Sequence, residues 1–398
     1  MDMLFTAYFA FFVTGMTSTI LGAILPDLRD AYGLSYVVAG SLYSFHQIGN
    51  LCAVFLAGVL PYIIGRKKSV TILFSALVIG TILITASPMP VVLMIAYACT
   101  GIGRGNTSNI TNVIVSEHAK NKARGLNLLH AIFACGALFS PFLLVICSSL
   151  FRNTQAGGWR ITLWIMAFCM LCALVLFATS ALSNTPERRA SKDGQDVSGT
   201  QNAETVHDGN LPPFYCSFDY WLNVAILLFY LCGESGCTGW LVTYFKDSGL
   251  FGETFAKLTS SFMWLMVMIG RLSVAVLARK LNKSVLIGVL AFLNTAFFVL
   301  MIASHSSALI IAGLLGTGLS MSGIYPTTLS TMHRAYNTSP LASGIAIGSA
   351  VSGGIFMPVI VGAVSDRYGV THGISCIALA LGIMLTLTLV KLVRSFKK

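Results

Sequence analysis

A glutamate lies in the middle of a long apolar stretch, where a charged side chain is costly. Glu234 is about ten residues, or roughly 15 Å of helix, from one end of the stretch at 220–244. Tyr230 and Thr238 lie four residues to either side, so all three share one helical face. Desolvation favours the neutral form of a carboxylate, and such a group can bind and release a proton near neutral pH. The spacing predicts that Glu234 exchanges an ion and that Tyr230 and Thr238 contact a ligand; a structural carboxylate is the alternative.

An arginine lies midway along another apolar stretch, at 90–115. Thr100, Thr107 and Ser108 lie three or four residues from Arg104 on the same helical face. A charge at bilayer depth costs about 2.5–3.5 kcal/mol on insertion scales, so each one is a candidate for function. Three roles remain open for Arg104. It could clamp a carboxylate or phosphate in bidentate fashion, pair with Glu234, or be a snorkelling or backbone-bonded arginine.

Further polar and aromatic residues inside apolar stretches are candidates for contact with a ligand: His46, Gln47 and Asn50 within 37–60, Asn109 beside Arg104, Asn127 and His130 within 126–150, and Trp240 and Trp264. Each has a structural alternative, because a lone histidine or amide in a membrane is often a hydrogen-bonded packing residue. The two tryptophans could stack on a sugar face or simply pack. Arg271 lies in the stretch at 258–278, where a structural or gating role is expected.

Motifs for catalysis are missing from the sequence. There is no nucleotide-binding loop, and GIGRG (101–105) lies inside an apolar stretch, where its glycines suit helix packing. The ten cysteines are scattered, and the one CxxC pair, Cys169 and Cys172, has no histidine or acid nearby. We therefore expect no enzyme activity, no metal and no cofactor.

The composition excludes a soluble protein. Of the 398 residues, 56% are apolar and only 10% are charged, whereas a soluble domain carries about 25% charged residues. The net charge of +11 does not indicate nucleic-acid binding, because most Lys and Arg lie in short clusters between apolar stretches. These features predict helices packed in a lipid bilayer.

The sequence predicts an all-α membrane protein with twelve transmembrane helices. Each apolar stretch has roughly the 20 residues that a bilayer requires. We expect spans at 4–25, 37–60, 69–86, 90–115, 126–150, 160–182, 220–244, 258–278, 284–303, 306–329, 340–362 and 372–393. Most Lys and Arg fall in the connections that are cytoplasmic if the N-terminus is inside, so both termini are expected in the cytoplasm. We expect a monomeric, multi-pass protein of the plasma membrane, in particular the cytoplasmic (inner) membrane of a bacterium.

The spans form two similar halves. A polar stretch at 183–217 is expected to be a cytoplasmic linker between six-helix bundles at 1–182 and 218–398. Matching segments hold the same place in each half: IGNL (48–51) and IGRL (269–272), TGIGRG (100–105) and TGLSMS (317–322), CGALFSP (135–141) and SGGIFMP (352–358). Such duplication is typical of transporters that rock two halves around a central site.

The segment GVLPYIIGRKKS (58–69) resembles a loop signature of the major facilitator superfamily, Gly-x-Leu-x-Asp-x-x-Gly-Arg-Lys. The residues that match this signature include Gly58, Gly65, Arg66 and Lys67. The resemblance implies a gating role for these four residues. Tyr62 stands where the family has an aspartate that helps to latch the halves together. The resemblance therefore implies the fold and the transport mechanism, and the departure puts the latch in doubt.

Three further segments resemble the fucose-permease-type branch of sugar–proton symporters: SFHQIGNL (44–51), LNLLHAIFACGALFSP (126–141) and YLCGESGCTGWLVTYF (230–245). This resemblance implies secondary active transport of a small polar metabolite, a sugar or an acidic sugar derivative, by alternating access. The coupling ion would be a proton, with sodium as the alternative. A metabolite or drug efflux carrier and an organic-anion transporter of the same superfamily remain as alternatives, and nucleic acid is not an expected partner.

Overall fold

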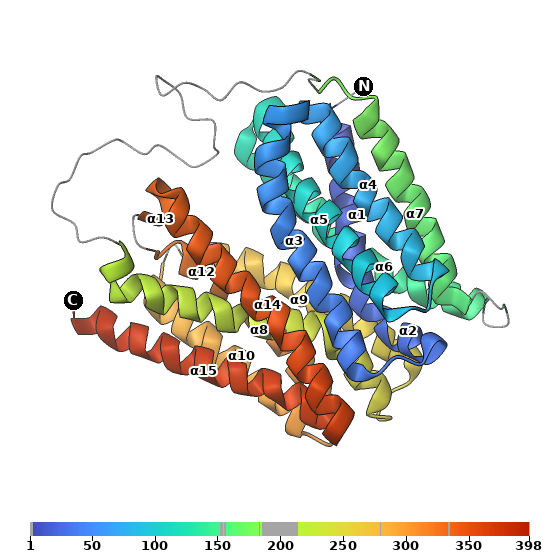
Figure 1. The fold of residues 1–398 in the computed structure, drawn as a ribbon. Helices are drawn as coiled ribbons and strands as arrows, with labels where there is room; N and C mark the ends of the chain where they lie inside the picture. Colours follow the sequence, from blue (N-terminus) through green and yellow to red (C-terminus); the bar gives the residue numbers. More distant parts are fainter. Residues whose placement is uncertain are drawn as a thin grey trace, which may run out of the picture. The chain divides into compact units, whose positions relative to one another are not determined.

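In the computed structural model, the described residues are 3–151, 154, 157–182, 184, 214–278, 280–332 and 335–397, and all regular structure within them is helical (Figure 1). The chain divides into two compact units. Of the linker expected at 183–217, most residues lie outside the described ranges; Phe214–Cys216 form a short 3-10 helix, η1.

The N-terminal unit contains the helices α1 (Met3–Ala23), α2 (Leu25–Tyr32), α3 (Tyr36–Ile64), α4 (Arg66–Ala86), α5 (Pro90–His118), α6 (Lys122–Leu150) and α7 (Gly157–Ala178). It also includes Glu253–Ser261, the first turns of α9 (Glu253–Leu277). Helix α9 therefore begins in the N-terminal unit and continues into the C-terminal unit.

The C-terminal unit contains α8 (Phe218–Asp247), the remainder of α9, α10 (Lys283–Ala303), α11 (Ser307–Met321), α12 (Ile324–Leu329), α13 (Ala335–Thr338), α14 (Pro340–Tyr368) and α15 (Val370–Lys397). Each of the twelve predicted spans coincides with helical residues. Ten of these helical segments are long and apolar enough to cross a membrane. The other two are α5, which carries Arg104 among many polar residues, and α9, which carries Glu253, Lys257 and Arg271.

The span predicted at 306–329 is broken into α11 and α12, with Ser322 and Gly323 between them. Pro326 lies in the first turn of α12. Proline has no backbone N–H, so it cannot donate to the carbonyl of Ser322 four residues earlier. The break follows from this missing hydrogen bond and from the flexibility of Gly323.

Local sequence signals set several helix ends. Ser35 accepts a hydrogen bond from the Val38 N–H (3.3 Å) at the start of α3, and Asn121 accepts one from the Arg124 N–H (3.0 Å) at the start of α6. Gly65 separates α3 from α4 with a φ of 86°, a conformation that residues with a side chain rarely adopt.

Helix packing repeats between the units. In the N-terminal unit α1 packs against α6 and α7, and α4 packs against α5 and α7; in the C-terminal unit α8 packs against α14 and α15, and α10 packs against α11 and α15. A side chain at Gly136 of α6 would collide with the Phe12 carbonyl of α1, and one at Gly353 of α14 would collide with the Leu228 carbonyl of α8. The halves are thus pseudo-symmetric, as the sequence repeat predicts.

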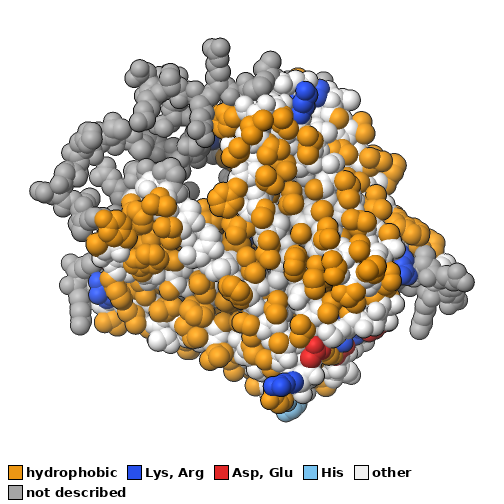
Figure 2. All heavy atoms as spheres, in the orientation of Figure 1, with side chains coloured by type: hydrophobic (Ala, Val, Ile, Leu, Met, Phe, Trp, Pro, Cys, Tyr) orange, Lys and Arg blue, Asp and Glu red, His pale blue; other side chains and the backbone are white. Residues whose placement is uncertain are grey.

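Hydrophobic side chains cover most of the described surface seen in Figure 2, where Lys, Arg, Asp and Glu are sparse. Large apolar residues such as Phe168 and Leu379 are more than half exposed. A water-soluble protein would not present so much apolar surface, whereas lipid chains can cover it.

Candidate functional site

A cluster of four polar side chains lies in the C-terminal unit. On α8, the Tyr230 phenol hydrogen-bonds the side chain of Glu234, one helical turn further on. Arg271 of α9 and Tyr325 of α12 lie within electrostatic range of Tyr230. The rings of Tyr230 and Tyr325 are 5.7 Å apart between centroids. We call these four residues the Glu234 cluster.

The Glu234 cluster combines a carboxylate, a guanidinium and two phenols. Tyr230 is buried, with 3% of its surface exposed, whereas Glu234 is half-buried and Arg271 is exposed. The Thr238 hydroxyl, one turn beyond Glu234, donates to the Glu234 backbone carbonyl at 2.8 Å. The phenol and the guanidinium are groups that stabilise a negatively charged carboxylate.

A second polar cluster lies in the N-terminal unit, between α3 and α5. The Nδ1 atom of His46 is 2.9 Å from the Thr100 hydroxyl oxygen, and His46 is 1% exposed. Arg104, one turn after Thr100, is half-buried and within electrostatic range of His46. The structure thus brings together His46 and Arg104, which the sequence placed on separate helices. We call His46, Thr100 and Arg104 the Arg104 cluster.

The other candidates on these two helices have different surroundings. Gln47 is buried, and Asn50 faces α5, because a side chain at Gly105 would lie 2.8 Å from its amide oxygen. Thr107 is fully buried, and its hydroxyl donates to the Gly103 carbonyl at 2.7 Å. Asn109 is exposed.

Asn127 and His130 lie on α6, and both are exposed. The His130 ring meets the ring of Phe11 on α1 edge-on, with centroids 5.6 Å apart. This contact suits either a packing role or a position beside a ligand, and a role in binding stays a prediction.

The two tryptophans differ in burial and bonding. Trp240 is fully buried, and its indole N–H donates to the Pro358 carbonyl at 3.0 Å, an arrangement that a packing role explains. Trp264 is half-buried, and its buried indole N–H has no hydrogen-bond partner within the described part of the chain. A buried indole N–H of this kind can donate a hydrogen bond to a ligand oxygen.

The loop motif contains an ion pair that the sequence did not reveal. Arg66, directly after Gly65, donates to both carboxylate oxygens of Glu117 on α5, at 3.1 and 3.0 Å. Gly58 has open space around its α-carbon, and Lys67 is half-buried. Although Tyr62 occupies the aspartate position, the arginine of the motif, Arg66, still has an acidic partner in Glu117.

Sequence reasoning missed Tyr325 and Glu117. Tyr325 lies in the segment SGIYPTT (322–328), which carries no Asp, Glu, His, Lys or Arg to draw attention to it. Glu117 lies at the end of a predicted span, where an acid is unremarkable. A third missed group, Asp27 and Lys257, comes from segments more than 200 residues apart.

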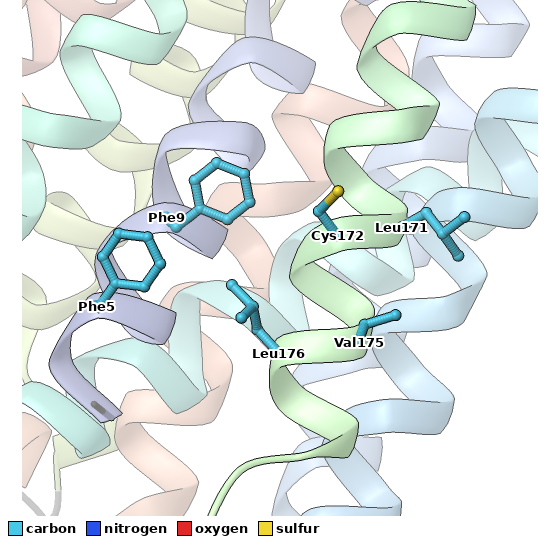
Figure 3. Close-up of a pocket in the computed structure, with 6 residues that line it drawn as sticks. All are labelled: Phe5, Phe9, Leu171, Cys172, Val175 and Leu176. Atoms are coloured by element: carbon cyan, nitrogen blue, oxygen red, sulfur yellow. The ribbon is translucent and has the colours of Figure 1, made fainter. Parts of the chain in front are cut away.

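The described residues contain no group of His, Cys, Asp and Glu side chains that could hold a metal ion. An open groove of about 470 Å³ lies between α1 and α7 and is lined by Phe5, Phe9, Leu171, Cys172, Val175 and Leu176 (Figure 3). Its lining is almost entirely apolar, and none of the candidate site residues contributes to it. This groove therefore does not include the two polar clusters.

Two pseudo-symmetric bundles of membrane-spanning helices, each containing a polar cluster, are an architecture typical of membrane transporters for small molecules. The sequence pattern of the Major Facilitator Superfamily matches residues 7–345, and the chain belongs to this family of secondary transporters. The fold agrees: a bacterial homolog of the human lysosomal transporter Spinster, solved in an inward-facing, occupied conformation, superposes with a TM-score of 0.74. The two chains are 12% identical, and the match covers 97% of this chain and 95% of that one.

Sequence relatives include proteins with different substrates. A TsgA homolog of Edwardsiella ictaluri is 24% identical over 82% of this chain and 78% of its own length. A gallate transporter of Pseudomonas putida is 24% identical over 88% of this chain and 82% of its own length. An arabinose-proton symporter of Bacillus subtilis is 24% identical over 48% of this chain and 43% of its own length.

Proposed function

We propose that this secondary transporter moves a small polar metabolite, a sugar or an acidic sugar derivative, by alternating access coupled to protons. We further propose that it is a monomer of the bacterial cytoplasmic membrane with both termini in the cytoplasm. The observation that carries the coupling is the Glu234 cluster, a carboxylate hydrogen-bonded inside a membrane-spanning helix. Desolvation of a charge at this depth is energetically costly, so a charged residue there usually has a function.

The composition of the Glu234 cluster favours a proton over a sodium ion. Protonation neutralises the Glu234 carboxylate where it stands and leaves the Tyr230 phenol able to hydrogen-bond it. A sodium ion would add the same positive charge near Arg271 but would also need several oxygen ligands, and besides the carboxylate the Glu234 cluster offers only two phenols. The relative named as an arabinose-proton symporter also supports proton coupling.

Two alternatives within the family remain. An efflux carrier for drugs or metabolites would favour an apolar, aromatic binding site, and the His46, Thr100 and Arg104 side chains argue against it. An organic-anion transporter is favoured by one observation, the presence of Arg104 inside α5, and by the relative named as a gallate transporter.

Transport by the purified full chain in proteoliposomes tests the proposal. Vesicles loaded with a pH-sensitive dye are screened with L-arabinose, L-fucose, D-glucuronate and gallate. Glu234→Gln mimics the protonated carboxylate permanently. It should abolish accumulation driven by a pH gradient while preserving exchange of labelled for unlabelled substrate, because exchange needs no net proton movement.

Asp247→Asn, an exposed acid at the end of the same helix, is the matched control and should leave accumulation unchanged. If Glu234→Gln also loses exchange, Glu234 contacts substrate or pairs with Arg104 instead of carrying the proton. Normal accumulation by Glu234→Gln would contradict both roles.

A further inference from the structure

We propose that the transported substrate carries a single carboxylate group and that Arg104 is its binding residue. This inference rests on the proposed function for the existence of a transported substrate. It goes further by naming the chemical class of that substrate and the residue that selects it.

Arg104 lies deep within the membrane-spanning helix α5. Fourteen residues of α5 precede it and fourteen follow it, so it lies roughly 21 Å of helix from either end. Every other described Lys or Arg of the N-terminal unit lies within two turns of a helix end or outside a helix. Arg104 cannot be explained as a topology signal or an interface anchor, as those residues can.

The N-terminal unit supplies no counter-charge for Arg104 among its described residues. Among its acids near helix ends, Glu117 pairs with Arg66, and Asp27 and Glu253 pair with Lys257, while Asp30 is exposed on the short helix α2. Arg104 makes no hydrogen bond or ion pair within the described part of this unit. A half-buried guanidinium without a counter-ion in its own unit is energetically costly, and an anionic ligand would remove that cost.

The charge of the Arg104 cluster matches one carboxylate. The hydroxyl of Thr100 donates to the Tyr97 carbonyl at 2.7 Å, so the contact with His46 is satisfied when Nδ1 of His46 carries a proton. His46 is 1% exposed, and its contact with Thr100 requires only the neutral imidazole with a proton on Nδ1. The cluster therefore offers one positive charge, which balances a monocarboxylate; a phosphate monoester, with a charge of about −1.5 to −2, would stay uncompensated.

The packing of α5 holds the backbone around Arg104 in place. A side chain at Gly101 would collide with the His46 carbonyl of α3, and one at Gly103 would collide with Leu77 of α4. These close contacts fix α5 against both neighbouring helices, so the Arg104 side chain projects from a rigid backbone. The planar guanidinium is already arranged for two parallel hydrogen bonds, so less conformational entropy is lost per bond when a carboxylate binds.

Ligand binding to the purified full chain in detergent tests this inference without a pH gradient or transport. The probes are charged and neutral pairs of similar shape: D-gluconate with D-glucitol, D-glucuronate with D-glucose, and benzoate with benzyl alcohol, with glucose 6-phosphate added as a phosphate. Binding is measured by the shift in melting temperature and then by calorimetry. We expect at least one carboxylate to bind about 10- to 100-fold more tightly than its neutral partner, as charged hydrogen bonds imply.

Three variants assign the effect to Arg104. Arg104→Gln should abolish the preference for the carboxylate, and Arg104→Lys should weaken it, because lysine keeps the charge but loses the two-pronged geometry. Without ligand, Arg104→Gln should melt at a higher temperature than the wild type, whereas loss of a merely structural arginine would lower it. Arg160→Gln is the matched control: it removes a positive charge of the same unit that stacks on Trp159.

Equal binding of the neutral partners, unchanged in Arg104→Gln, would overturn the inference. Preference for glucose 6-phosphate would overturn it in favour of a phosphate site. The inference would also be overturned if no carboxylate raised the melting temperature of the wild type more than that of Arg104→Gln. None of these results depends on Glu234. Proton-coupled transport of a neutral sugar would thus sustain the proposed function while contradicting this inference.

Discussion

The ammonium group of Lys257, on the second turn of α9, lies 3.0 Å from the carboxylate of Asp27 on α2. Both side chains are largely buried, with 5% and 11% of their surfaces exposed. Lys257 also lies 2.9 Å from the Glu253 carboxylate and donates to the Ser148 hydroxyl at 3.1 Å. Its three N–H donors therefore have three partners, and they fasten the first turns of α9 to the N-terminal unit.

Removal of either member of this ion pair should destabilise the protein strongly. Lys257→Met leaves the Asp27 carboxylate buried without its cation, and Asp27→Leu leaves Lys257 with the more exposed Glu253. Breaking a buried pair in this way costs about 3–5 kcal/mol. We expect a large fall in melting temperature for each single variant and recovery of much of it in the double variant.

Lys283→Met, which removes an exposed lysine at the start of α10, is the control and should leave the melting temperature nearly unchanged. Single variants as stable as the wild type would show that the pair contributes nothing to the attachment of α9. Ser261, whose hydroxyl donates to the Leu138 carbonyl at 3.0 Å, would then be the main anchor.

The Arg66–Glu117 pair should act as a unit in transport. Glu117→Gln removes the negative charge of the carboxylate that accepts both hydrogen bonds from Arg66. We expect slower transport. The loss of stability should be only about 0.2–1 kcal/mol, because both side chains are partly exposed. Exchanging the two charges, Arg66→Glu with Glu117→Arg, should restore much of the transport rate. Vesicle uptake measures the rate, and Lys68→Gln is the control for loss of a nearby exposed charge. Failure of the exchanged pair to recover would mean that Arg66 acts through another partner.

Equivalent glycines of the two halves should respond alike to substitution. Gly136→Val and Gly353→Val would each drive a side chain into a backbone carbonyl of the neighbouring helix, which cannot move aside as a flexible side chain can. Overpacking of this kind costs about 1–3 kcal/mol or more. Gly348→Val on α14 is the control, because the space beside it is open.

Melting temperatures and the yield of monodisperse protein compare these three variants. We expect clear losses at positions 136 and 353 and a small effect at position 348. A Gly353 variant that tolerates valine while the Gly136 variant does not would contradict the equivalence of α6 and α14.

The sequence alone determined the number and position of the membrane-spanning helices. Hydrophobic length is a local property, and the cost of exposing backbone to lipid leaves a helix as the one structure available to each apolar segment. For the same reason Glu234 and Arg104 could be identified without a structure, because a charge in an apolar segment is anomalous wherever that segment packs. The repeat of matching glycines likewise predicted two halves with equivalent helix contacts.

Tertiary structure decided the partners of these residues. Tyr230 could be assigned to Glu234 from helical spacing, but Tyr325 and Arg271 join them only through the packing of α8, α9 and α12. Glu117 reaches Arg66 across 51 residues, and Lys257 reaches Asp27 across 230. A side-chain contact between helices depends on how each helix is rotated and which turns lie level, and the hydrophobic pattern of a membrane helix constrains neither, because lipid and protein interior are equally apolar.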